Sequence, residues 1–97
     1  MPPATQLSPL QIRDKIWDTS DAIAVAPTGP NVMVLLEQMY DLVAQAEIII
    51  DNHEGMTKEA KYELQRTIDS IVERGYLHAV LNNATATLNK PKKLIKL

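Results

Sequence analysis

Two histidines and a nearby group of acidic residues are the side chains of this 97-residue chain best suited to metal chemistry. Three acids lie close to His53 in the sequence: Glu47, Asp51 and Glu54. A helical di-iron site needs Glu-x-x-His, with both side chains projecting into a bundle core. Ile50 stands three residues before His53, and Gly75 stands three residues before His78. The ligand pattern is absent, so we predict no metal site and no cofactor.

Nucleophilic and acid–base catalysis also lack support in the sequence. No serine sits in a glycine elbow, and each of the three glycines is explained by a turn or a helix break. A glycine-rich phosphate loop is therefore missing as well. There is no cysteine, which excludes a disulfide framework and a thiolate metal site. We predict that the protein is not an enzyme.

Basic side chains gather in two places suited to nucleic acid. One group follows Thr57 and the other lies at the C-terminus: Lys58, Lys61, Arg66, Lys90, Lys92, Lys93 and Lys96. The join through Gly55 has helix-turn-helix spacing, in which a second helix and a basic arm contact DNA. However, six basic against twelve acidic residues give positions 1–74 a charge of −6, which phosphates repel. A small oligomeric nucleic-acid-binding regulator is therefore the alternative function.

An acidic helix surface is the main candidate for binding a protein partner. Residues 32–54 contain acids but no Lys or Arg, and two large apolar side chains share the acidic side. The predicted partner-binding residues are Met33, Glu37, Asp41, Glu47, Ile48, Asp51 and Glu54, together with Trp17. We predict a non-catalytic protein–protein interaction module that uses this face and self-associates. A further alternative is an immunity or inhibitor-type protein whose acidic helix docks on a basic target.

Trp17 has two interpretations. It is a core or boundary residue with Arg13, one turn earlier, against its ring, or it is an exposed anchor for a partner. The sequence pattern around it favours the first, because Trp17 shares a narrow apolar row with Leu10 and Ala24.

The clearest helical period in the chain lies between residues 32 and 54. Apolar residues recur there every three or four positions: Val32, Leu36, Met39, Val43, Ala46 and Ile50. A second row runs beside the first at Leu35, Leu42 and Ile49. Together the rows form an apolar sector roughly 140° wide, broader than a two-stranded coiled coil needs. This helix should therefore lie at the centre of a bundle.

Two more helices flank the central one. Ser8 and Pro9 form a helix start, and Pro27 ends that helix. Thr57 caps the third helix, whose apolar stripe changes phase at Gly75. We predict a break there, followed by a short fourth helix over about 76–83. The alternative is an unbroken helix whose far end uses its other face to bind a second copy.

The whole chain should form one all-α domain over residues 1–97. We expect a small antiparallel bundle of three long helices plus the short fourth helix, with flexible termini. Residues 1–7 should be a loose arm, and residues 90–97 a basic tail. No stretch approaches the ~20 apolar residues of a membrane span, and the first residues lack a signal-peptide pattern. We expect a cytoplasmic protein with a protein partner.

Overall fold

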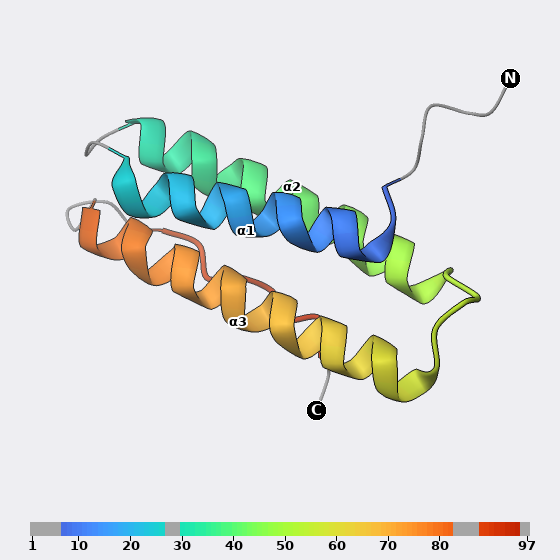
Figure 1. The fold of residues 1–97 in the computed structure, drawn as a ribbon. Coiled ribbons are helices and arrows are strands. Elements are labelled where there is room, and N and C mark those ends of the chain that lie inside the picture. The colour runs from blue at the N-terminus through green and yellow to red at the C-terminus, as the bar shows by residue number, and fades with distance from the viewer. Residues whose placement is uncertain (1–6, 27–29, 83–87, 96–97) are drawn as a thin grey trace, which may run out of the picture.

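Three helices make up the regular structure of the protein. The computed structural model describes residues 7–26, 30–82 and 88–95. Helix α1 spans Pro9–Val25, α2 spans Pro30–Asp51 and α3 spans Lys58–Asn82. The chain reverses direction between α1 and α2 and again between α2 and α3 (Figure 1). The described residues contain no strand, so the all-α class is confirmed.

The helices begin where the sequence provides caps. The Ser8 hydroxyl accepts a hydrogen bond from the Gln11 amide at 3.2 Å, and the Ser8 amide donates to Gln11 Oε1 at 2.9 Å. This reciprocal capping box, with Pro9 next to it, satisfies amides that lack a partner inside the helix. Thr57 Oγ1 likewise accepts from the Ala60 amide at 3.1 Å. Both predicted helix starts are confirmed.

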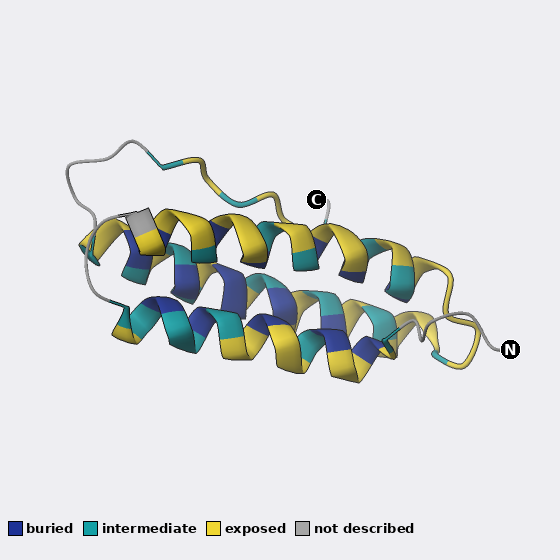
Figure 2. Cartoon of the chain, turned by 90° about the horizontal axis from the view of Figure 1, so that it is seen from above, coloured by how far each residue is buried: buried dark blue, intermediate teal, exposed yellow. Residues whose placement is uncertain are grey.

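The core lies along the predicted apolar row of α2. All six residues of that row are buried: Val32, Leu36, Met39, Val43, Ala46 and Ile50. They pack against Ile12, Ile16 and Ile23 of α1 and against the buried face of α3. Buried surface lines the inner sides of all three helices, whereas their outer sides are exposed (Figure 2). Helix α2 contacts both other helices, but its contact with α3 is the smallest of the three helix pairs and α1 has the most extensive contacts, so the central position predicted for α2 is not confirmed.

Helix α3 runs through Gly75 without a break, contrary to our prediction. Gly75 is buried, and a Cβ at this position would lie 2.8 Å from Met39 Sδ and 3.0 Å from Ser20 Oγ. The glycine therefore lets three helices approach closely, rather than ending one of them. No fourth helix occurs in the described residues, and position 83 of the predicted one lies outside them.

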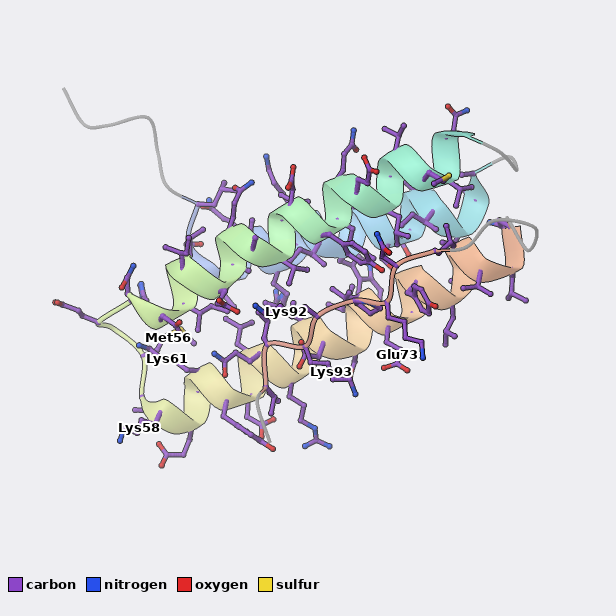
Figure 3. All side chains as sticks on the ribbon, turned by 180° about the vertical axis from the view of Figure 1, so that it is seen from behind. Met56, Lys58, Lys61, Glu73, Lys92 and Lys93 are labelled. Carbon is purple, nitrogen blue, oxygen red and sulfur yellow. The ribbon has the colours of Figure 1, made fainter. Side chains whose placement is uncertain are left out.

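Residues 88–95, hereafter the C-terminal segment, lie where the fourth helix of a bundle would stand. We expect a flexible tail, but the described part is non-helical and lies against α2 and α3 (Figure 3). Leu94 is buried, and Leu88 packs against the core cluster. Positions 1–6 of the predicted N-terminal arm and residues 96–97 lie outside the described part.

Candidate interaction surfaces

The residues of the predicted acidic face diverge around α2. Asp41 borders a hollow that it shares with Lys15 and Asp18 of α1. Glu47 and Ile48 border a different cavity, next to the C-terminal segment. Six residues separate Asp41 from Glu47, which turns their side chains about 120° apart on a helix. The structure therefore does not bring these two acids onto one surface.

The other members of the predicted face are spread along the helix and beyond its end. Met33 and Glu37 are exposed near the start of α2. The Asp51 carbonyl, in the last turn, accepts a hydrogen bond from Lys61 Nζ at 3.2 Å. Glu54 is exposed in the connection between α2 and α3. A partner would have to span the length of α2 to contact all of them.

Trp17 lies between α1 and α3 and is 44% exposed. The guanidinium carbon of Arg74 stands 5.2 Å from the centre of its ring, a cation–π distance. Arg74 also forms an ion pair with Asp21 at 2.9 Å. Arg13, which we expected against the ring, pairs with Asp14 at 3.0 Å instead. Trp17 is thus one of the exposed large apolar residues and not part of the core, and the cation against its ring comes from α3.

The basic residues proposed for nucleic acid are separated as well. Lys61 reaches back to cap α2, and Lys58 is exposed at the start of α3. Arg66 shares one hollow with Trp17 and another with Lys93. The others lie in the C-terminal segment, except Lys96, which lies outside the described residues. Acidic side chains of α3 also border these hollows, so the described residues form no continuous basic surface.

The C-terminal segment bridges α2 and α3 through hydrogen bonds to its backbone. Tyr40 Oη of α2 donates to the Asn89 carbonyl at 2.6 Å. The two carboxylate oxygens of Asp69, on α3, accept from the Leu94 and Ile95 amides at 2.7 and 3.0 Å. Figure 3 shows the segment beside α3, with Lys92 and Lys93 labelled on it. Tyr40 and Asp69 thus hold the segment near its two ends.

A cavity of about 350 Å³ lies beside this segment. Its walls are mainly apolar and come from α2, α3 and the segment itself, including Val43, Ala44, Val72 and Leu94. Burial, and secondarily the neighbouring Tyr76, raises the pKa of Tyr40 at this cavity to about 12. The neutral phenol is the form that donates to the Asn89 carbonyl, so Tyr40 holds the segment over the ordinary pH range.

Among the described residues, those at one end of the molecule carry no formal charge. Residues 22–36 and 75–89 contain no Asp, Glu, Lys or Arg, so all 22 such residues fall in the other 67 positions. The end of α1, the start of α2 and the end of α3 lie together there (Figure 1). Six of the ten large apolar residues exposed in the described part belong to this apolar end: Val25, Met33, Val34, Leu77, Val80 and Leu81.

Sequence reasoning identified only Met33 among these six as a site residue. Leu77, Val80 and Leu81 were expected on a separate fourth helix or, in the alternative, on the far end of an unbroken helix that binds a second copy. The missed signal was available, because one charge-free stretch of 15 residues contains the first connection and another begins at Gly75. Asp69 and Tyr40 gave no comparable signal, since their partners lie 20 or more residues away along the chain.

Comparison with models of known protein families, with curated proteins and with solved structures found no match for this chain. Within the described ranges, no group of three or more His, Asp or Glu side chains is placed to hold a metal ion. The described helices also include none with the length and apolar character to cross a membrane.

Proposed function

We propose that the protein is a non-catalytic protein-interaction module that self-associates through the apolar end. The observation that carries this proposal is the row of exposed aliphatic side chains on the last turns of α3. Leu77, Val80 and Leu81 have i, i+3 and i+4 spacing, which places them on one face of the helix, away from Gly75 and Ala79 in the core. An unbroken helix with a second apolar face favours a partner for that face.

Burial of these side chains provides the driving force. Leu77 is 53% exposed and Leu81 is 75% exposed, and apolar surface gains about 25 cal/mol per Å² when it leaves water. A stable interface buries about 800 Å² on each partner. That is roughly one eighth of the 6631 Å² surface of this chain.

Charge favours a second copy as the occupant. An uncharged surface is complementary to another uncharged surface, because a charged partner group would lose its hydration without gaining an ion pair. A two-fold symmetric dimer places the same surface of both copies in the interface, and two copies of the apolar end would both be uncharged there. The remainder of the chain carries about one charged residue in three, and so offers a copy no comparable surface.

The test is the mass of the protein in solution with Leu77→Glu, Leu81→Glu, or both. We expect the 10.8 kDa chain to form a dimer and the double variant to be monomeric, because dimerisation would bury the new carboxylates. Analytical ultracentrifugation over a concentration series measures the mass. Both leucines are largely exposed, so a circular dichroism melt should show little change in folding.

Leu10→Glu is the matched control for this experiment. Leu10 is 54% exposed, close to the 53% of Leu77, but it lies in the first turn of α1, at the opposite end of the molecule. This variant should remain dimeric. A wild-type protein that is monomeric at its highest soluble concentration would contradict self-association. Equal loss of dimer in Leu10→Glu would contradict the assignment to the apolar end.

A further inference from the structure

The C-terminal segment lies in the groove between α2 and α3 and fills only part of it. Tyr40 and Asp69 hold the backbone of the segment, and Leu94 is buried between the helices. We infer that this groove is a binding site for an extended basic and apolar peptide segment of another protein, for which residues 88–95 act as an internal competitor. This inference concerns a different surface from the apolar end and does not depend on self-association.

The contacts that hold the segment would hold other extended peptides too. Asp69 accepts hydrogen bonds from two consecutive main-chain amides, and Tyr40 donates to a main-chain carbonyl. Every non-proline residue offers these backbone groups, so such contacts provide affinity without requiring the side chains of this chain. Specificity must therefore come from the side-chain positions and from charge.

The cavity shows where a bound peptide could make side-chain contacts that residues 88–95 do not make. Leu94 borders the cavity of about 350 Å³, together with Val43, Ala44 and Val72. The C-terminal segment is extended and therefore narrower than a helix, and the Leu94 side chain does not fill this apolar volume. A peptide with a larger apolar side chain at the position of Leu94 would gain contacts that the internal segment lacks.

Charges along the groove favour a basic peptide. Glu47 borders the cavity together with Lys90 and Lys92. Asp69 and Glu73 border the adjacent hollow together with Lys93 and Arg66. The lysines of the segment thus share these hollows with acids of both helices, and the same acids would attract the lysines of a partner. The same acids repel the phosphates of a nucleic acid, which argues against that occupant.

The test uses the full-length chain with Leu94→Ser, which weakens the internal competitor without removing it. The probe is a fluorescent synthetic peptide with the sequence of residues 86–97 and Leu94→Trp. When the internal segment occupies the groove, the apparent affinity for the probe is reduced by the fraction of molecules whose groove is free. Leu94→Ser should therefore bind the probe at least about tenfold more tightly than the wild type. Fluorescence anisotropy measures both dissociation constants.

Two acid variants in the Leu94→Ser background locate the peptide. Asp69→Ala removes the acceptor of both amides and should abolish binding. Glu63→Ala removes the same charge from an exposed site of α3 that borders the hollow beside Trp17, and should leave binding unchanged. Equal binding by the two acid variants, or by the wild type and Leu94→Ser, would overturn the inference.

Hydrogen exchange of the wild-type protein provides a test that needs no variant. A saturating amount of the probe should accelerate exchange at the Leu94 and Ile95 amides, because the peptide displaces them from Asp69. Unchanged exchange at saturation would overturn the inference. A dimer with swapped C-terminal segments, whose Leu94 and Ile95 amides stay protected at saturation with the probe, would assign the groove to a second copy and also overturn it.

Discussion

Gly75 illustrates, at the scale of one residue, how a helix-breaking residue can serve packing instead. It lies in the interior of α3, where glycine usually costs about 1 kcal/mol relative to alanine. Its missing side chain leaves room for Met39 of α2 and for Ser20 of α1, whose hydroxyl donates to the Ile71 carbonyl at 3.2 Å. The contact of three helices at one point compensates for the weak helix propensity.

Gly75→Ala should therefore destabilise the protein, although alanine is the better helix former. The new Cβ would stand 2.8 Å from Met39 Sδ, and Met39 is fully buried, so it has little room to move. We expect a net loss of about 1–3 kcal/mol, typical of an overpacked core. Urea unfolding of wild type and variant measures the difference.

Met39→Ala is the partner change for this test, because it removes Sδ and Cε, the atoms nearest to the new methyl group. The double variant should lose less stability than the two single variants added together, since the clash depends on both residues. A Gly75→Ala protein that is more stable than the wild type would show that Gly75 is not a packing residue.

The C-terminal segment shows, at the scale of an element, how hydrogen bonds to main-chain groups can hold a non-helical piece of chain in a helical fold. The segment lies in the groove between α2 and α3 (Figure 3). Its amides and carbonyl groups cannot pair within the segment as they would in a helix. Tyr40 and Asp69 provide partners from two different helices, which ties the segment to both.

The stability gained from the Tyr40 contact should depend on pH. The pKa of Tyr40 is about 12 in the folded protein and about 10 when unfolded. The folded state thus keeps a proton that the unfolded state releases. The contribution is complete below pH 10 and is lost as the pH rises towards 12. The stability difference between wild type and Tyr40→Phe should be constant at neutral pH and shrink above pH 10.

Urea unfolding at several pH values measures this difference, and absorbance at alkaline pH follows the phenolate directly. Subtracting the titration curve of Tyr40→Phe from that of the wild type leaves the titration of the Tyr40 phenol alone. A midpoint near 10 in that difference would contradict a buried, hydrogen-bonded phenol. Near neutral pH, Tyr40→Phe should lose about 1 kcal/mol with the hydrogen bond to Asn89.

Charged residues are distributed unevenly along the molecule. Binding at the two proposed surfaces should therefore depend on different physical forces. The apolar end has no formal charge, whereas the groove between α2 and α3 combines acids with the lysines of the C-terminal segment. Self-association should then depend on burial of apolar surface, and peptide binding partly on electrostatic attraction.

Salt should distinguish these two forces in one protein preparation. Raising NaCl from about 0.01 M to about 1 M shortens the Debye length from about 30 Å to about 3 Å. The dimer dissociation constant should stay nearly constant, whereas the dissociation constant of the basic peptide for Leu94→Ser should rise several-fold. Ultracentrifugation and fluorescence anisotropy measure the two constants. A dimer that dissociates at high salt would contradict an uncharged interface.

Local rules were sufficient for the parts of the structure that depend on neighbouring residues. The spacing of apolar residues along α2 identified its buried side, because a helix places residues three and four apart on one face. Ser8, Pro9 and Thr57 identified two helix starts, because a cap involves residues within one turn.

Tertiary structure decided everything that depends on residues far apart in the chain. Gly75 looked like a helix break until Met39 and Ser20, 36 and 55 positions earlier, were seen to pack against it. Arg74 rather than Arg13 covers Trp17, because α3 lies beside α1. Contacts of this kind have no period and no fixed spacing. The sequence alone therefore determined where the helices begin and which sides they bury, and only packing in three dimensions decided which surfaces remain for partners.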